Sequence, residues 1–94
     1  MARHYARKVD LNHAQIRTEL RQAGLMVVDT SRLGGGVPDL VVFDSRNARA
    51  RWVEIKSKGG KLTPDELVFF EEWGDLVMMA YSTEDVLRAF GMLD

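Results

Sequence analysis

The stretch GVPDLVVFDSRNARARWVEIKSK, Gly36 to Lys58, decides the fold because it contains two apolar strands joined by a polar turn. Runs rich in Val, Ile, Phe and Trp on both sides of DSRN are typical of a β-hairpin. Each strand nevertheless carries an acid, Asp39 in the first and Glu54 in the second, where an apolar side chain would suit a core better. Lys56 follows two residues after the second acid.

The length of the turn sets the register of the hairpin. A four-residue loop at 45–48 pairs Asp44 with Arg49, and in that register Asp39 lies opposite Glu54. Side chains in this position have Cβ atoms about 4.5–5.5 Å apart, and like charges there destabilise a sheet. Two carboxylates held this close need a proton, a basic neighbour or a cation. Strand alternation places a basic group, that of Lys56, on the same face as Glu54.

An Asp, a Glu and a Lys on one face suit the metal-assisted hydrolysis of a phosphodiester. Carboxylate oxygens bind Mg²⁺, the metal lowers the pKa of a bound water, and an ammonium group orients that water or stabilises developing charge. The backbone carbonyl of Ile55 is a further candidate ligand. The alternative is a buried salt bridge among Asp39, Glu54 and Lys56 that serves only the fold, although buried ion pairs stabilise proteins poorly compared with apolar residues.

The chain before the hairpin predicts a helix and a strand. The first eight residues, MARHYARK, predict a loose basic arm. In DLNHAQIRTELRQAG, residues 10–24, apolar residues recur at helical spacing and a glycine stops the helix. Asp10 or Asn12 is a candidate cap at its start. A short strand, LMVVDT, and a glycine-rich loop, SRLGGGVP, then lead into the hairpin.

The chain after the hairpin predicts two helices separated by a strand. Thr63 and Glu66 form a capping box with Pro64 at the first helical position. LVMMAY predicts a strand, and Ser82 opens a last helix. The order α-β-β-β-α-β-α predicts a single α/β domain over residues 1–94, with a mixed sheet flanked by helices.

Composition narrows the class of protein. No apolar run approaches the roughly 20 residues of a membrane span, so no membrane partner is expected. The absence of cysteine rules out disulfides and fits a cytoplasmic protein. The net charge is −1, but 12 of the 13 Lys and Arg lie at or before Lys61, and eight acids follow it. This segregation predicts a positive face for DNA, or reflects a chance difference between solvated faces.

GGGVPDLVV followed by RWVEIKSKGGKLTPDE resembles the PD-(D/E)XK nuclease superfamily, and more closely the small VRR-NUC and Holliday-junction-resolvase-like proteins of phages and prophages. The resemblance extends from about residue 10 to the last helix. The Pro-Asp at 38–39 and the Glu-Ile-Lys at 54–56 match the motif position by position. The resemblance implies a restriction-endonuclease-like fold with an αβββαβ core.

The resemblance also implies a site in which Asp39 and Glu54 bind Mg²⁺ or Mn²⁺ and Lys56 is the catalytic lysine in cleavage of DNA. In such nucleases a glutamate on the first helix often completes the metal site, and here Gln15 stands at that position. Glu19, one turn later on the same face, is the other accessory candidate, unless it is a surface acid that pairs with nearby arginines.

Loops beside the hairpin contain candidate DNA contacts. Gly35 and Gly36 let the backbone approach a phosphate, with Arg32 beside them, unless the glycines only form a turn that needs positive φ. Lys58 and Lys61 follow the catalytic strand and are expected to hold the cleaved strand, unless their loop is merely exposed.

The second helix of these nucleases often opens with a glutamine, where this chain has Glu66. The capping box already accounts for that residue, so a catalytic role for it is only an option.

These observations predict a metal-dependent DNA endonuclease of a bacterial or phage-infected cell. A compact site without an added recognition domain suggests selection of DNA structure over sequence, and the resemblance implies branched or flapped DNA. A homodimer would supply two active sites for a symmetric junction. One alternative is a non-catalytic nucleic-acid-binding module on the same fold. Another is a nuclease subunit that acts only with a helicase or another phage replication or packaging protein.

Overall fold

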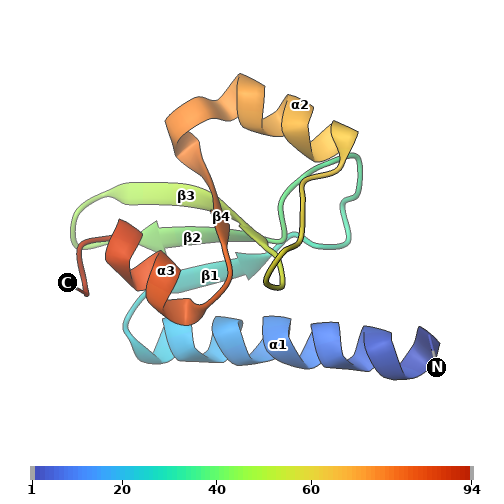
Figure 1. The fold of residues 1–94 in the computed structure, drawn as a ribbon. Helices are drawn as coiled ribbons and strands as arrows, with labels where there is room; N and C mark the ends of the chain where they lie inside the picture. Colours follow the sequence, from blue (N-terminus) through green and yellow to red (C-terminus); the bar gives the residue numbers. More distant parts are fainter. Residues whose placement is uncertain (1, 94) are drawn as a thin grey trace.

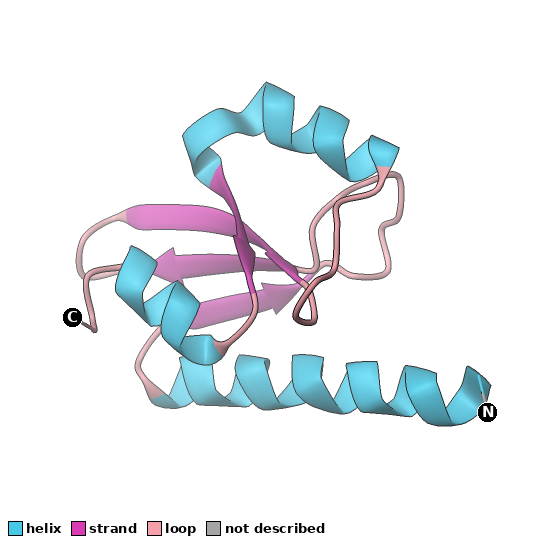
Figure 2. Cartoon of the chain, viewed as in Figure 1, coloured by secondary structure: helices cyan, strands magenta, loops and turns pink. Residues whose placement is uncertain are grey.

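The computed structural model describes residues 2–93, with side chains described for residues 12–93. The elements in chain order are α1 (Ala2–Gln22), β1 (Met26–Asp29), β2 (Leu40–Asp44), β3 (Arg49–Ile55), α2 (Pro64–Trp73), the short 3-10 helix η1 (Gly74–Leu76), β4 (Val77–Ala80) and α3 (Thr83–Ala89). Figures 1 and 2 show these elements as a twisted sheet with helices on both faces. The predicted element order and fold class are confirmed. Among the described residues, no helix combines the length and apolar character needed to cross a membrane.

The four strands form one mixed sheet in the order β1-β2-β3-β4. The pairs β1–β2 and β2–β3 are antiparallel, whereas β3–β4 is parallel and is connected through α2. The predicted hairpin register is confirmed, since Asp44 pairs with Arg49 and the ladder continues to Leu40 and Val53. Asp39 and Glu54 come one step beyond that last pair, at the open end of the hairpin.

The main core lies on the sheet face covered by α1 and α3. In Figure 1, α1 (blue) and α3 (red) lie on one side of the sheet and α2 (orange) on the other. Alternate residues of the strands point into this core, among them Leu40 and Val42 of β2 and Val53 and Ile55 of β3. They pack with buried apolar residues of the two helices: Ile16, Leu20, Val86 and Phe90.

The opposite face of the sheet carries a smaller aromatic cluster under α2. The ring of Trp52 meets Phe69 and Trp73 edge-on, with centroids 5.3 Å and 5.5 Å away. Phe69 and Trp73 stack on each other at 5.2 Å. Because Glu54 and Lys56 alternate in phase with Trp52, they also belong to the α2 face. The hairpin therefore separates an apolar core on one face from a partly charged layer on the other.

The first helix begins earlier than predicted. It starts at Ala2, so residues 2–8 belong to α1, where the sequence predicted a loose arm and a helix start near Asp10. The physical reason is composition, since no Gly or Pro occurs between residues 2 and 23 and good helix formers dominate. Asn12 consequently lies inside the helix rather than at its cap. The side chains of the basic residues Arg3, Arg7 and Lys8 lie outside the described residues.

The start of α2 has the predicted capping box. The Thr63 side chain accepts a hydrogen bond from the Glu66 N–H, and the Glu66 side chain accepts one from the Thr63 N–H, with Pro64 at the first helical position. The start of α3 also agrees with prediction, because the Ser82 side chain accepts from the Asp85 N–H.

The glycine loop packs directly against the first turn of α2. Gly36 has φ +86°, and a Cβ at this position would lie 2.4 Å from the backbone oxygen of Asp65. Gly35 also has positive φ, +63°, but a Cβ there would meet nothing within 4 Å. Both glycines therefore form a turn that needs positive φ, as the alternative to a phosphate contact predicted. Only at Gly36 must a side chain also be absent for α2 to pack on the loop.

We predict that Gly36→Ala destabilises the protein more than Gly35→Ala does. Both variants suffer the strain of positive φ, about 1 kcal/mol. Gly36→Ala also forces α2 away from the loop, which adds about 1–3 kcal/mol. Unfolding in urea measures the two free energies. Equal losses would show that the loop and α2 do not pack as described.

Candidate active site

Asp39 is held at the open end of the hairpin by backbone hydrogen bonds on both sides. The Thr30 N–H donates to the Asp39 carbonyl at 2.8 Å, and the Thr30 hydroxyl donates to the Pro38 carbonyl at 2.7 Å. Across the hairpin, the Ile55 N–H donates to the Asp39 carboxylate at 2.8 Å. The Asp39 carboxylate is therefore fixed next to the end of β3, beside Glu54.

Glu54 is a buried carboxyl group with acidic neighbours. The residue is only 4% exposed. Burial, the nearby charges of Asp39 and Glu66, and a hydrogen bond shared with Glu66 raise the pKa of Glu54 to about 8, although Lys56 opposes the shift. The electrostatic conflict between Asp39 and Glu54 that the register predicted is thus present. Even with the Lys56 ammonium beside it, this shift favours the protonated form of the Glu54 carboxyl near neutral pH when no metal ion is bound.

Lys56 lies between two carboxyl groups on the same face. Its Nζ is 3.4 Å from Glu54 Oε2 and 2.9 Å from Glu66 Oε1. Burial disfavours the ammonium charge, but the contacts with Glu66 and Glu54 outweigh it and raise the pKa of Lys56. The lysine is therefore charged, and Glu66 is its nearer partner.

Glu66 is the member of this cluster for which the sequence left two roles open. The capping box explained its presence at the start of α2, and a catalytic role was only an option. The structure shows that the same carboxylate reaches Lys56, because α2 starts above the end of β3. The sequence did contain a positional signal. Glu66 is the third residue of the helix that follows β3, and the first turn of that helix lies over the end of the strand that leads to Lys56.

The donor atoms at this site fit a divalent cation. Residues 12–93 contain no ready-made group of three Asp, Glu, His or Cys side chains arranged for a metal. Mg²⁺, however, usually takes one or two carboxylates and keeps several waters. Asp39 and Glu54 supply two such carboxylates, and the pKa of Glu54 is raised by burial and by the Asp39 charge, both of which a bound cation would offset.

The two accessory candidates on α1 have other partners. The Gln15 amide donates to Glu19 Oε2 at 3.2 Å, and the Thr83 hydroxyl donates to Glu19 Oε1. The Thr83 hydrogen bond, followed by that from Gln15, lowers the pKa of Glu19. These contacts lie between α1 and the start of α3, whereas Glu54 and Lys56 belong to the α2 face. The interactions of Gln15 and Glu19 are thus with each other and Thr83, and those that act on Glu54 come from Asp39, Glu66 and Lys56.

The predicted DNA contacts lie on the two loops that flank the cluster. Arg32, Gly35, Lys58 and Lys61 are exposed, and Gly36 is half-buried against α2. The ladder places the end of β1, the start of β2 and the end of β3 at the same end of the sheet, since Asp29 pairs with Leu40 and Leu40 with Val53. The exposed cations of both loops therefore lie at the same end of the sheet as Asp39.

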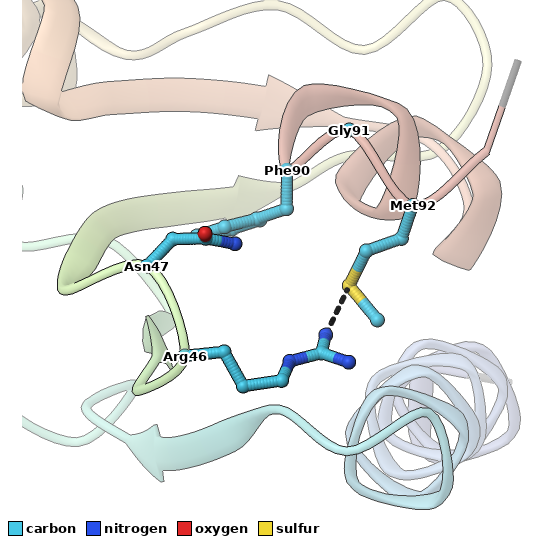
Figure 3. A pocket seen from close by; sticks show the side chains of 5 residues that line it. All are labelled: Arg46, Asn47, Phe90, Gly91 and Met92. Carbon is cyan, nitrogen blue, oxygen red and sulfur yellow. Dashed lines mark hydrogen bonds between the residues drawn. The ribbon is translucent and has the colours of Figure 1, made fainter.

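A pocket at the other end of the hairpin is separate from this cluster. It is lined by Arg46, Asn47, Phe90, Gly91 and Met92. Figure 3 shows the Arg46 guanidinium pointing toward the Met92 sulfur, to which it donates at 3.5 Å. Arg46 and Asn47 belong to the turn between β2 and β3, whereas Asp39 and Glu54 lie where those strands separate. The pocket therefore contributes nothing to the acidic cluster.

We predict that Thr30→Val weakens both the fold and the position of Asp39. Valine keeps the shape of threonine but leaves the buried Pro38 carbonyl without its hydroxyl donor, at a cost of about 1–3 kcal/mol. Thr18→Val, the same change at an exposed helical position, is the control. Chemical denaturation compares the two variants. A loss for Thr30→Val no larger than for Thr18→Val would contradict the assigned hydrogen bond.

Comparison with known proteins assigns the chain to a family. A family model of the VRR-NUC domain matches residues 5–80, a range that includes the whole acidic cluster. A solved structure described as a VRR-NUC domain superposes with a TM-score of 0.64 and 24% sequence identity, over 87% of this chain and 92% of that chain. A search of curated proteins found no match. The solved structure supports the fold and the family model supports the ancestry, so the chain belongs to the VRR-NUC nuclease domain family.

Proposed function

We propose that the protein is a metal-dependent DNA endonuclease that hydrolyses phosphodiester bonds. The observation that carries this proposal is the convergence of Asp39, Glu54 and Lys56 at one end of the sheet, in a domain of a nuclease family. Burial and the neighbouring acids Asp39 and Glu66 raise the pKa of Glu54, and a salt bridge that served only the fold would not require this electrostatic conflict. Such perturbed carboxyl groups are typical of functional sites.

Each residue of the cluster has a defined part in this reaction. The carboxylates of Asp39 and Glu54, with the Ile55 carbonyl, would hold Mg²⁺ or Mn²⁺. A bound cation of this kind supplies Lewis-acid activation of water and neutralises charge on the phosphate. Asp39 is kept in place by the Ile55 N–H, so its carboxylate needs little rearrangement. The Lys56 ammonium would donate to a phosphate oxygen as negative charge develops.

Phosphate contacts from the flanking loops are proposed to hold the DNA. Arg32, Lys58 and Lys61 are exposed cations around the site, and the backbone of Gly35 and Gly36 offers a close approach. Contacts of this type position a duplex without reading its sequence. We therefore propose selection by DNA structure, with branched or flapped DNA as the substrate class.

A homodimer is proposed as the form that acts on a symmetric junction. Apolar side chains on the α2 side of the molecule are exposed, among them Met26, Val28, Val68 and Trp73. A second copy that covers them would bring two acidic clusters into one assembly. A helicase or another phage replication or packaging protein is the alternative partner for this surface.

Cleavage of a matched set of DNA substrates tests the proposal. Four-way, flap, linear duplex and single-stranded DNA of equal length are incubated with the protein and Mg²⁺, Mn²⁺ or EDTA. We expect cleavage only with a metal ion, and faster cleavage of the branched forms than of the linear duplex. Binding of these substrates without cleavage under either metal would instead support a nucleic-acid-binding module. Equal cleavage rates on all four DNA forms would contradict the proposed selection of DNA structure but not the proposed nuclease activity.

A further inference from the structure

Lys56 is held mainly by a residue outside its own strand. Its Nζ lies 2.9 Å from Glu66 Oε1 on α2, compared with 3.4 Å from Glu54 Oε2 on β3. The side chains of Lys56 and Glu66 are 17% and 15% exposed, so this ion pair is largely shielded from water. The shorter contact therefore sets the direction of the ammonium group, which points between α2 and the end of β3.

The helix start holds Glu66 itself in place. Its Oε1 accepts the Thr63 N–H at 2.9 Å, and the Thr63 hydroxyl accepts the Glu66 N–H at 3.3 Å. The first turn of α2 is in turn packed on the loop at Gly36 through Asp65. One oxygen of Glu66 thus links the backbone of this turn to the lysine, with no freely rotating group between them.

The charge of Glu66 is not needed for capping. A glutamine at this position of a capping box accepts the same backbone hydrogen bond. The charge also affects the neighbouring acid, because Glu66 shares a hydrogen bond with Glu54 and contributes to its raised pKa. A negative charge that the helix cap does not need calls for another function. The contact with Lys56 provides one.

We propose that Glu66 is a positioning residue that orients the Lys56 ammonium toward the phosphate oxygens of a phosphodiester that water attacks. This inference rests on the proposed nuclease function and adds the element that aims its lysine. Glu66 acts through Lys56 and touches neither the DNA nor the reacting atoms. Displacements of about 1 Å at a reacting group commonly change rates by up to about 100-fold, so the anchor has a measurable effect.

The first test compares Glu66→Gln with Asp65→Asn, which removes the same charge one residue earlier from an exposed position. Glu66→Gln is expected to keep the capping box and to lower kcat by about 10-fold to 100-fold with KM unchanged. Asp65→Asn is expected to leave kcat and KM within about twofold of wild type. A Glu66→Gln variant with wild-type kcat, or one whose only change is in KM, would overturn the inference.

A second test does not depend on cleavage. The unfolding equilibria of wild type, Lys56→Met, Glu66→Gln and the double variant form a double-mutant cycle. Because the two side chains are in direct contact, the effects of the single variants are expected to be non-additive by at least about threefold in the unfolding constant. Additive effects would overturn the inference even if the enzyme is active. If the wild type fails to cleave any DNA, the proposed function falls, and the cycle still decides whether Glu66 holds Lys56.

Discussion

Glu54→Gln is expected to abolish cleavage and, at the same time, to make the metal-free protein more stable in alkaline buffer. The amide removes the negative charge of a proposed metal ligand, so the cleavage rate should fall by more than about 100-fold. The same change removes a buried carboxyl group whose neighbours oppose its ionisation. Function and stability should therefore move in opposite directions at this one residue, as is common at active sites.

The stability gain of Glu54→Gln should depend on pH in a defined window. The pKa of Glu54 rises from 4.5, its ordinary value, to about 8 in the folded protein. Below about pH 4.5, Glu54 is protonated in both the folded and the unfolded state, so its burial costs no stability. Between about pH 4.5 and pH 8, only the folded state keeps the Glu54 proton, so the free energy of unfolding of the wild type falls as pH rises. The loss is complete above about pH 8.

Thermal denaturation in EDTA from pH 4.5 to 9 measures this window. We expect the melting temperature of Glu54→Gln to exceed that of wild type above pH 8 by at least about 4 °C, which corresponds to about 1 kcal/mol in a domain of this size. The difference should shrink steadily toward pH 4.5. A difference that stays constant with pH would contradict the burial and the acidic surroundings assigned to Glu54.

Lys56→Met is expected to eliminate cleavage while leaving DNA binding nearly intact. Methionine keeps much of the length and apolar stem of lysine but has no ammonium group to stabilise charge on the phosphate. Loss of one such group usually lowers kcat by about 100-fold to 1,000-fold. Because Lys56 is only 17% exposed, it contributes little to the electrostatic attraction of DNA. Single-turnover cleavage and equilibrium binding in EDTA separate the two effects.

Lys58→Met is the matched control for this prediction. It removes the same charge two residues away, from an exposed position in the loop after β3. We expect it to weaken DNA binding and its salt dependence, with the single-turnover rate at saturating protein close to wild type. The assignment of Lys56 would be wrong if both variants changed binding and cleavage to the same degree.

The hairpin and its acids were predictable from sequence because local chemistry determines them. The four-residue turn after Asp44 sets a register that the structure confirms residue by residue. The starts of α2 and α3 were predictable for the same reason. The side chains of Thr63 and Ser82 cap these helices by accepting a hydrogen bond from a backbone N–H only three residues later.

Features that depend on contacts between residues distant in sequence could not be predicted from local patterns. The first helix extends to Ala2, because nothing in residues 2–8 interrupts it once its later turns pack on the sheet. The partner of Glu19 is Thr83, which is distant in sequence. The contact of Glu66 with Lys56 likewise depends on where α2 crosses the sheet, and a capping motif alone does not indicate that position.

Calorimetric titration of Mn²⁺ into wild type and Glu54→Gln tests the central claim most directly. The claim is that Asp39 and Glu54 form a metal site, and this measurement needs neither the correct DNA substrate nor a partner protein. We predict saturable binding by wild type that is lost or weakened at least about 10-fold in Glu54→Gln, and unchanged in the control Asp65→Asn. Equal Mn²⁺ affinity in wild type and Glu54→Gln would contradict the assignment of this cluster as the metal centre of a nuclease.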